Sequence, residues 1–467
     1  MSRTVLILGA GVTGLAAAWK LLQDAPGTRV MILEKDEVPG GLAKSISWHG
    51  YTLDLGPHRI YTEIPEIKAF FDSFCQEQLI SVPRASRMFL QEKYIAYPIN
   101  FLETFLALGI PTTARFLGSA LSVLLNRNKS AAETYEAYMK GYYGAGLYQR
   151  IFQPFAQKVW GVSGENLAAE TARVRLKGDS IWHALLDSLF SKEETYVSRF
   201  LYPRQGIGQI AEQFAQSITE WGGVFHYQTE ALRIELKPGG GVSIFANQQG
   251  REANFEGDLL INTIPLPALI DATPALQSPA LKDAARQLRF RPLVLVYMLY
   301  DKKLDVRDTW LYYPESHVPF TRVSVPDNFN PHQPFEGKTC LCVEFTCEKG
   351  DSTWLAEPHD LAARAQEIFL QSGLLRAPLA DALAVRLEYG YPVYQYGYES
   401  ARTRILHALA SCGSILTTGR QGLFRHNNID QSIQMGLLAA DHLVHSPDSL
   451  ADWYQQVSRF DSYRIID

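Results

Sequence analysis

The amino-terminal segment carries glycines at a spacing that can bind a phosphate. The run Gly9-Ala10-Gly11-Val12-Thr13-Gly14 follows an apolar stretch, residues 4–8, and precedes a helix-forming stretch, residues 15–22. In a strand, turn and helix of this kind, the first glycine permits the turn, the second lets the backbone approach a pyrophosphate, and the third lets the helix pack on the strand. The free N–H groups and the dipole at the helix amino terminus favour an anion there.

A second apolar run, residues 29–34, completes a βαβ unit and ends in an acid. Glu34 follows Gly14 by 20 residues, where a carboxylate can accept two hydrogen bonds from the ribose of an adenosine. A glycine fingerprint alone is a weak signal. The strand, the helix and the acid at this spacing together predict a site for a dinucleotide.

A second glycine turn, residues 39–44, comes after Glu34, and the basic Lys44 stands three positions beyond Gly41. A strand pair follows over residues 45–55, and then the run Gly56-Pro57-His58. This arrangement resembles the second FAD motif of the superfamily that contains amine oxidases, protoporphyrinogen oxidases and UDP-galactopyranose mutases. The resemblance changes the expected cofactor from NAD to FAD.

Two later segments extend the resemblance. Gly206-Ile207-Gly208 opens a helix, and the segment with residues 224–234 has the pattern of a strand, a turn and a strand. In the superfamily such a segment adds an edge strand whose backbone, near Ala231 here, clamps the adenine. Residues 258–264 return as a buried strand, so the cofactor domain is expected to be discontinuous.

Several short stretches are more similar to bacterial UDP-galactopyranose mutases than to amine oxidases in general. They occur in that family's order, and they are residues 56–62, 97–100, 158–161, 320–323, 391–393 and 419–425, with Asp430. His426 stands where the family has a tyrosine near the substrate diphosphate, and Asn427-Asn428 replaces a leucine and an acid. These departures concern the substrate and leave the expected fold unchanged.

The carboxyl-terminal motif has its own physical interpretation. Residues 414–419 are predicted to form a strand, residues 419–428 a loop, and residues 430–440 a helix with an acidic first turn. In the superfamily this helix faces the flavin pyrimidine and stabilises negative charge on the reduced ring. For Asp430, a helix cap and a cofactor contact are equally open, and one does not exclude the other.

Residues expected to contact FAD come from all of these segments. They are Gly9, Ala10, Gly11, Val12, Thr13, Gly14, Glu34, Lys35, Gly41, Leu42, Ala43, Lys44, Gly56, Pro57, His58, Ala231, Gly419, Arg420, Asn428, Asp430 and Ser432.

Four side-chain groups are candidates for the substrate chemistry. A pair of guanidinium groups could bind a diphosphate, and we expect Arg420 to supply one of them. The other is expected from either Arg173 or Arg175, and only one of these two can point into the site because residues two apart do not share a helix face. A solvated surface pair is the alternative for Arg173 and Arg175. Tyr391, like Trp160 and Tyr394, either stacks on a base or sugar or belongs to the core. By resemblance His58 is expected near the flavin N5.

Composition excludes several classes of function. The chain has 467 residues, a net charge of -5 and a pI near 6.2, which give no general attraction to nucleic acid. Five scattered cysteines predict neither a disulfide framework nor a metal site. No export signal is visible, so a cytoplasmic location is expected. The apolar segment 99–125 contains charges, and it is interpreted as amphipathic helices in a core, with peripheral membrane contact as the less favoured alternative.

The expected architecture is an α/β FAD-binding domain of Rossmann type from residues 1–80, 200–265 and 405–467, a helical insert over 85–197, and an antiparallel-sheet substrate domain over 266–404. The substrate cleft is expected between the two inserts.

By resemblance to the mutases, the leading hypothesis is a flavoenzyme whose reduced flavin N5 attacks the anomeric carbon of a nucleotide-linked sugar, with NAD(P)H as a possible reductant. The alternatives are an oxidoreductase of the protoporphyrinogen oxidase, desaturase or amine oxidase type, and a flavin-stabilised binding protein without turnover.

Overall fold

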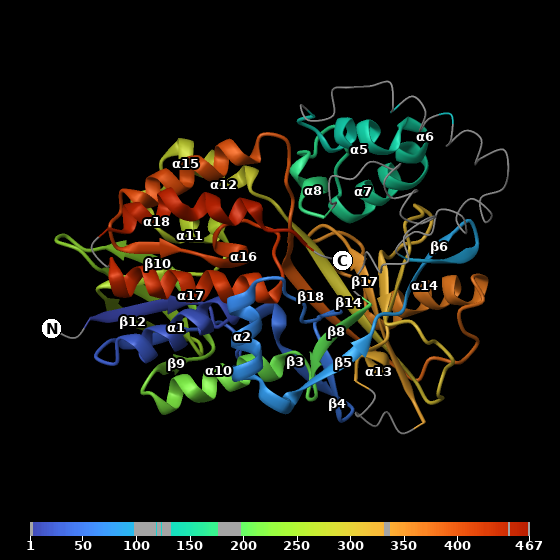
Figure 1. Ribbon diagram of the computed structural model, residues 1–467, viewed down its shortest axis with the longest axis horizontal. Helices are drawn as coiled ribbons and strands as arrows, with labels where there is room; N and C mark the ends of the chain where they lie inside the picture. Colours follow the sequence, from blue (N-terminus) through green and yellow to red (C-terminus); the bar gives the residue numbers. More distant parts are fainter. Residues whose placement is uncertain are drawn as a thin grey trace. The chain divides into compact units, whose positions relative to one another are not determined.

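The computed structural model describes residues 3–97, 118, 123, 132–175, 198–330, 337–446 and 449–465. Most of the apolar segment 99–125, residues 98–100 of the 97–100 motif and the end of the expected helical insert lie outside the described residues. The chain divides into two compact units (Figure 1). Unit 1 comprises Met1–Ile80, Gln205–Arg289 and Gly397–Ile465, and unit 2 comprises Ser81–Arg204 and Phe290–Tyr396.

Unit 1 is built on a five-stranded parallel sheet with the order β19-β13-β1-β2-β9. The strands are β1 (Thr4–Leu8), β2 (Arg29–Leu33), β9 (Val224–His226), β13 (Leu259–Asn262) and β19 (Ile415–Thr417). All but the edge strand β9 are almost entirely buried, which explains why they are continuous apolar runs in the sequence. The segments that leave β1, β2 and β19 therefore start from the same edge of the sheet.

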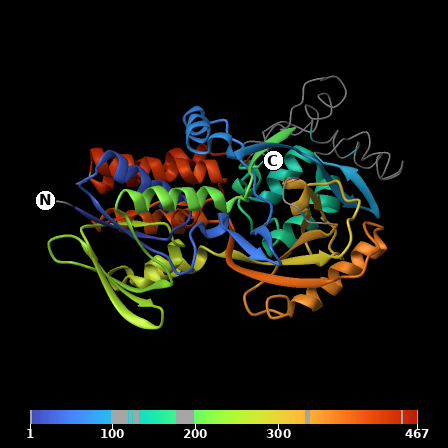
Figure 2. The ribbon, with the colours of Figure 1, turned by 90° about the horizontal axis from the view of Figure 1, so that it is seen from below.

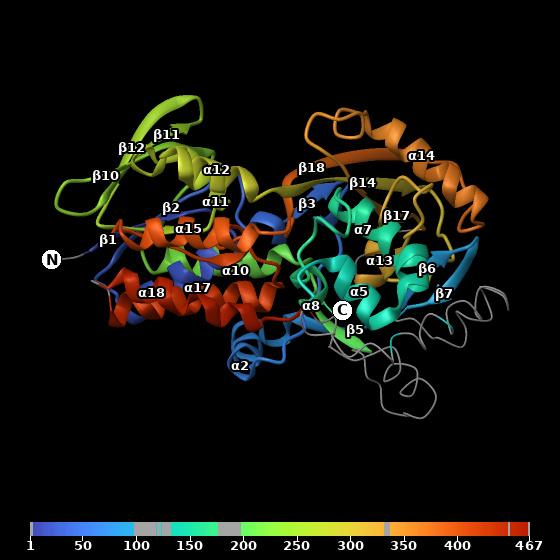
Figure 3. The same ribbon diagram turned by 90° about the horizontal axis from the view of Figure 1, so that it is seen from above.

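Three helices of unit 1 pack together beside this sheet. The helix α1 (Val12–Asp24) packs against α17 (Ile429–His445) and α10 (Gly208–Glu220); Figure 1 labels all three, and Figure 3 shows α10 and α17 from another side. A Cβ atom on Gly436 of α17 would lie 2.2 Å from the Thr13 carbonyl oxygen, so the glycine allows the two helices to approach closely. The other helical segments of unit 1 are η1 (Gly41–Ala43), α2 (Pro65–Phe74), η2 (Gln76–Gln78), α11 (Leu266–Ala272), η4 (Pro274–Leu276), α12 (Pro279–Gln287), α15 (Tyr398–Ala410), α16 (Gly419–Gly422), α18 (Leu450–Gln456) and η5 (Val457–Ser462).

Unit 1 also contains two small antiparallel sheets. One is the predicted hairpin of β3 (Ser45–Trp48) and β4 (Tyr51–Asp54). The other, seen in yellow-green in Figure 2, joins β10 (Thr229–Leu236), β11 (Val242–Gln248) and β12 (Arg251–Gly257). The strand, turn and strand that the sequence indicates from residue 224 onward are confirmed, with β9 in the parallel sheet and β10 in the three-stranded sheet.

Unit 2 is built on a seven-stranded sheet with the order β18-β14-β17-β16-β15-β6-β7. The strands are β6 (Ser86–Leu90), β7 (Lys93–Ala96), β14 (Phe290–Tyr300), β15 (Trp310–Tyr312), β16 (Arg322–Ser324), β17 (Thr339–Thr346) and β18 (Asp381–Pro392). The fold class expected from the sequence is confirmed, with two corrections. The insert expected to be helical supplies β6 and β7, and β6 pairs with β15 in parallel, so the sheet is not purely antiparallel.

The two faces of this sheet have different roles. Leu341, Val343 and Phe345 of β17 pack with α14 (Pro358–Gln371), which covers β14 and β18. Cys347 belongs to the same apolar cluster, whereas Cys340, Cys342 and Glu344 of the alternating run do not. Because side chains alternate along a strand, Glu344 is on the face opposite α14.

The remaining elements of unit 2 complete the helical part and one small sheet. They are β5 (Leu79–Pro83), which begins in unit 1, α5 (Tyr135–Tyr143), α6 (Ala145–Leu147), the π-helical η3 (Tyr148–Phe152), α7 (Gln153–Trp160), α8 (Glu170–Arg173), β8 (Arg199–Pro203) and α13 (Pro326–Phe329). Residues 266–289 and 397–404, expected in the substrate domain, cluster with unit 1. The functional assignment of the three expected domains stays a prediction.

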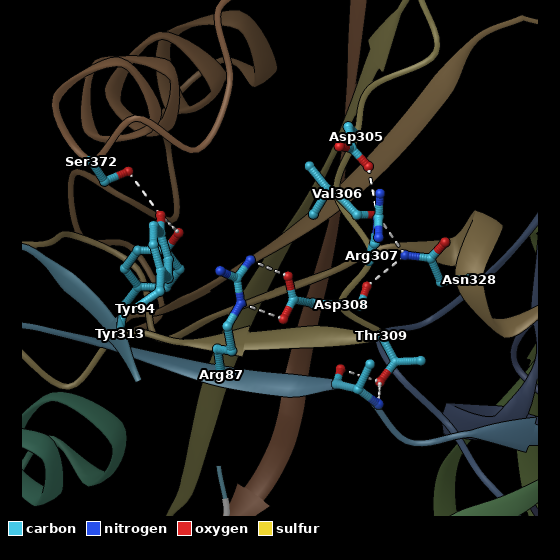
Figure 4. A network of polar contacts seen from close by, with 11 residues as sticks. Arg87, Tyr94, Asp305, Val306, Arg307, Asp308, Thr309, Tyr313, Asn328 and Ser372 are labelled. Carbon is cyan, nitrogen blue, oxygen red and sulfur yellow. Dashed lines mark hydrogen bonds and ion pairs between the residues drawn. The ribbon is translucent and has the colours of Figure 1, made fainter. Parts of the chain in front are cut away.

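A partly buried ion pair links β6 to the residues that precede β15, its parallel neighbour (Figure 4). Arg87 donates from Nε and Nη2 to the two carboxylate oxygens of Asp308 at 2.8 and 2.6 Å. The Asp308 side chain is 5% exposed and that of Arg87 is 42% exposed. Nearby, the Thr309 hydroxyl donates to the Ala85 carbonyl at 2.7 Å. The geometry is bidentate, which is the strong form of this contact.

Replacing Arg87 by alanine is expected to destabilise unit 2, because the Asp308 carboxylate would stay buried without its partner. The expected loss is about 2–4 kcal/mol, below the upper end for fully buried pairs because the guanidinium is partly solvated. Urea unfolding followed by near-ultraviolet circular dichroism measures it. Arg307→Ala is the control, since Arg307 and its partner Asp305 are 88% and 82% exposed. Equal unfolding midpoints for the two variants would contradict this account.

Candidate functional site

The turn between β1 and α1 has the geometry of a phosphate site. Gly9 has a φ of +96°, and its N–H donates to the Leu33 carbonyl at 2.9 Å. A Cβ atom on Gly14 would lie 2.2 Å from the Gly9 carbonyl oxygen, so the third glycine is required for packing. A Cβ atom on Gly11 would meet nothing within 4 Å. Gly11 is also the N-cap of α1, with no side chain to satisfy the first N–H groups.

The second glycine turn packs on the first. The Gly40 N–H donates to the Ala10 carbonyl at 2.8 Å, and Gly40 forms an isolated parallel bridge with Gly11. A Cβ atom on Gly41 would lie 3.2 Å from the Gly11 Cα atom. The two glycine segments predicted from the sequence are therefore brought together around the open space at Gly11.

The Glu34 carboxylate is engaged with the backbone. Its Oε2 accepts a hydrogen bond from the Ala10 N–H at 2.6 Å, and its Oε1 accepts one from the Asp36 N–H at 2.9 Å. Burial raises the pKa of Glu34, and the two backbone hydrogen bonds oppose that rise. Glu34 thus holds the turn after β1, while the ribose contact stays a prediction. Lys44 forms an ion pair with Asp36 at 2.7 Å.

The loop between β19 and α17 closes another side of this turn. A Cβ atom on Gly419 would lie 2.8 Å from the Thr13 side chain. The expected continuous loop contains one short helix, α16. Asn428 is the N-cap of α17 and forms a capping box with Gln431, so the interpretation of Asp430 as the cap is wrong. Asp430 lies inside the first turn and is 6% exposed, and burial raises the pKa of its carboxyl.

Polar side chains of this loop bond to one another. Arg420 donates from Nη1 to the Asn427 carbonyl at 2.9 Å. The Asn427 Nδ2 donates to the Ser432 hydroxyl at 2.6 Å, and the Ser432 hydroxyl donates to the Asn428 carbonyl at 2.9 Å. Arg425, whose side chain is 5% exposed, pairs with Asp461. The sequence predicts that Arg420 binds a diphosphate, and this stays a prediction, whereas in the structure Arg420 orders the loop.

The other predicted cofactor residues lie in three places within unit 1. His58 follows Gly56, which has a φ of +85°, and the His58 Nε2 lies 3.2 Å from the Leu55 carbonyl oxygen. Ala231 lies at an irregularity in the pairing of β10 with β11. Lys35 is exposed, and Ala43 is buried in η1 beside the half-buried Leu42. Their contacts with FAD stay predictions.

In unit 2 the predicted arginines separate. Arg173 donates from Nη2 to the Ala132 carbonyl at 2.7 Å and lies over the Tyr138 ring at 5.6 Å. Arg175 instead lies over the Trp160 ring at 4.8 Å. This difference agrees with the expectation that two residues so spaced point to different surroundings.

Trp160 and Tyr391 belong to one cluster with two residues that sequence reasoning missed. The Trp160 and Tyr391 rings meet edge to face at 5.9 Å. Arg322 donates from Nη2 to Glu344 Oε2 at 2.6 Å and to the Tyr391 hydroxyl at 3.1 Å. The Arg322 Nε is buried and has no hydrogen-bond partner among the described residues. An acid at position 344 inside an alternating apolar run was the signal that could have revealed this pair.

Lys158, in the 158–161 motif, joins α7 to a segment between β15 and β16. Its Nζ donates to the carbonyls of Tyr313 at 2.7 Å, Phe320 at 3.2 Å and Glu315. Burial lowers the pKa of Lys158 to about 7, and Glu315 opposes the shift. The 158–161 and 320–323 motifs therefore meet in space, and Lys158 has a structural role.

A family model for flavin containing amine oxidoreductases matches residues 12–366. The chain belongs to this family. It is a flavoenzyme, and FAD is its cofactor. The open space at Gly11 beside the uncapped start of α1 fits the pyrophosphate of that cofactor.

Known relatives agree on the fold and differ in their reactions. A solved structure of reduced UDP-galactopyranose mutase has a TM-score of 0.81, is 21% identical, and covers 97% of this chain and 98% of that chain. A putative protoporphyrinogen oxidase from Exiguobacterium has a TM-score of 0.73 at 16% identity over 95% and 99% of the two chains. Coproporphyrinogen III oxidase of Staphylococcus aureus is 22% identical over 255 residues, 49% of this chain and 54% of that protein. The chain thus matches about half the length of this curated relative.

The described residues lack two further features. None of their helices combines the length and the apolar character needed to cross a bilayer. Among the same residues, no group of histidine, cysteine, aspartate and glutamate side chains is arranged to hold a metal ion.

Gly11→Ala tests the phosphate site. The added methyl group meets no protein atom, so the fold should persist, but it would occupy the space where the pyrophosphate approaches the backbone. Loss of one hydrogen bond to a charged group weakens binding by about 10–100-fold, and we expect FAD affinity to fall by that factor. Fluorescence titration of the apoprotein with FAD measures it. Gly27→Ala, also free of contacts within 4 Å, is the matched control. An unchanged affinity in Gly11→Ala would contradict the assignment.

Proposed function

We propose that the protein is a UDP-galactopyranose mutase-like flavoenzyme that acts on a nucleotide-linked sugar through N5 of reduced FAD. The observation that carries the proposal is the cluster of Arg175, Trp160, Tyr391 and Arg322 in unit 2. The order of the short motifs along the sequence and the likeness to the mutase structure support it.

The chemistry of this cluster suits a nucleoside diphosphate. Guanidinium groups bind phosphate oxygens through charge-assisted hydrogen bonds, and aromatic rings offer faces to a base or a sugar. Glu344 balances part of the charge of Arg322, so Arg322 stays ionised in a half-buried place. The N–H group at its buried Nε can donate a hydrogen bond to an anionic oxygen of the substrate.

In this proposal the residues of unit 1 hold the cofactor and do not change the substrate. Gly11 and the first turn of α1 receive the pyrophosphate, Glu34 receives the adenosine ribose, and His58 lies beside the flavin ring. Bound and reduced, FAD supplies the nucleophilic nitrogen. The arginines stabilise the negative charge that develops on the departing diphosphate. The source of the reducing electrons is proposed to be NAD(P)H.

The two neighbouring arginines give a sharp test with UDP as the probe. Arg175→Ala should weaken UDP binding by about 10–100-fold, because a charged hydrogen bond contributes about 1.5–3 kcal/mol. Arg173→Ala is the matched control, since its guanidinium is held by the Ala132 carbonyl and lies over a different ring. Calorimetric titration of the two variants and the wild type measures the effect.

Two results would contradict the proposal. Wild-type protein that does not bind UDP would remove the nucleotide-linked substrate. Equal affinities for UDP in the wild type and Arg175→Ala would show that the cluster does not bind the diphosphate.

An oxidoreductase reaction is the second candidate, and the match to coproporphyrinogen III oxidase over 255 residues favours it. In that case a reduced substrate would transfer hydride to oxidised FAD. Anaerobic mixing of the oxidised protein with coproporphyrinogen distinguishes the two. Bleaching of the flavin absorbance would support this candidate, and an unchanged spectrum is what the mutase-like proposal expects.

A further inference from the structure

Lys158 lies on α7, two residues before Trp160. Residues two apart on a helix point to nearly opposite sides, and the contacts of the two side chains agree with this. The Trp160 ring meets the Tyr391 ring, and the Arg175 guanidinium lies over it. The Lys158 Nζ donates instead to carbonyl groups of the segment between β15 and β16. One short helix thus connects that segment to the proposed substrate cluster.

The end of α7 is held at two further points. The Thr346 hydroxyl at the end of β17 donates to the Lys158 carbonyl at 2.7 Å. Gly161 is the C-cap of α7 with a φ of +72°, and a Cβ atom on it would lie 2.4 Å from the Arg291 Nη1. Arg291 is itself 9% exposed and forms an ion pair with Glu348. The last turn of α7 is therefore fixed against β17 and the start of β14.

The bonds of Lys158 depend on its charge. Its three carbonyl partners, at Tyr313, Glu315 and Phe320, match the three N–H donors of an ammonium group. A neutral amine has two N–H donors, so one carbonyl would lose its partner. Burial lowers the pKa of Lys158 to about 7. The ammonium is therefore present below that pH, and one of its bonds is lost as the pH rises through it.

Glu315 supplies the negative charge that favours the ammonium form of Lys158, and it opposes the effect of burial on the pKa of this lysine. The Glu315 Oε1 accepts the Gln91 N–H at 3.1 Å, and its Oε2 lies 4.0 Å from the His317 imidazole. Other titratable side chains on the surrounding elements bond to further groups: they are Tyr313, Glu344 and Glu348, which bond to Tyr94, Arg322 and Arg291 respectively.

We propose that the Lys158 ammonium positions Trp160 for the nucleotide, so that substrate affinity depends on whether this amine is charged. The inference rests on the proposed function, which assigns Trp160 and Arg175 to the substrate. With the amine charged, three bonds hold α7 to the segment between β15 and β16 and keep the Trp160 ring in its place. With the amine neutral, one bond is lost, and binding must order a more mobile ring. Lys158 is thus a positioning residue that acts through Trp160.

Lys158→Met tests this inference, because it keeps the apolar length of the side chain and removes the ammonium. The dissociation constant for UDP is measured by calorimetry in the holoprotein at pH 6 and pH 8.5. The ratio of the constants of variant and wild type cancels the protonation of UDP itself. We expect a ratio of about 10 at pH 6, the lower end for one charged hydrogen bond, and about 2–3 at pH 8.5, where the neutral amine of the wild type bonds more weakly.

Lys349→Met is the matched control, since the Lys349 side chain is 61% exposed and pairs with Glu388 at 2.8 Å. Its ratio should be close to 1 at both pH values. A Lys158→Met ratio that is the same at pH 6 and pH 8.5 would overturn the inference, because a merely structural role weakens binding without regard to the charge of the amine.

Glu315→Gln tests the same inference with the lysine in place. It removes the charge that favours the ammonium, so the midpoint of the pH dependence of UDP affinity should move down by about one pH unit, the lower end of the effect of one nearby charge. An unchanged midpoint would overturn the inference even if Lys158→Met does not fold.

The positioning role also has a readout without nucleotide. Hydrogen exchange of the backbone in residues 157–161 should be faster in Lys158→Met than in the wild type and in Lys349→Met. Equal exchange in all three proteins would overturn the positioning role by itself. Failure of the wild type to bind UDP would instead contradict the proposed function, so the two failures are distinct.

Discussion

The close approach of three backbone segments around the β1–α1 turn is the constraint on which unit 1 depends. A side chain on Gly14 would meet the Gly9 carbonyl at 2.2 Å, and one on Gly436 would meet the Thr13 carbonyl at the same distance. Gly41 closes the turn from a third direction. Because these contacts leave Gly11 facing open space, tight packing and the predicted pyrophosphate site depend on the same set of glycines. A substitution that loosens the packing would also displace the site.

Unit 2 depends on a different constraint, the alternation of side chains in a sheet. One face of β17 supplies Leu341, Val343 and Phe345 to the apolar core beneath α14. The opposite face carries Glu344, which accepts a hydrogen bond from Arg322, and Arg322 also donates to the Tyr391 hydroxyl. A buried charge on this face would destabilise the fold if it were unpaired, and here the acid and the guanidinium neutralise each other. One face of the sheet therefore packs the apolar core, and the other carries the polar cluster that we propose for the substrate.

The sequence was most informative where local rules determine the structure. The β1–α1–β2 unit, the β3–β4 hairpin and the β19–α17 connection depend on glycine spacing and apolar runs, and their positions could be predicted. Pairings between distant segments could not be, because nothing local reveals that β6 lies beside β15 or that Glu344 meets Arg322. The sequence marked Asp430 as a candidate helix cap or cofactor contact. The structure shows that Asn428 is the N-cap of α17, and the sequence alone could not decide between the two polar residues.

Mass analysis of the flavin is the most direct test of the central claim, that reduced FAD in this protein acts on a nucleotide-linked sugar. The protein is reduced anaerobically, incubated with a panel of nucleotide sugars and treated with cyanoborohydride, and its flavin is then extracted. We expect a flavin whose mass has increased by that of one sugar, only with reduced protein and only with the accepted nucleotide sugar. Flavin of unchanged mass with every sugar, in protein that retains FAD and binds UDP, would contradict the claim.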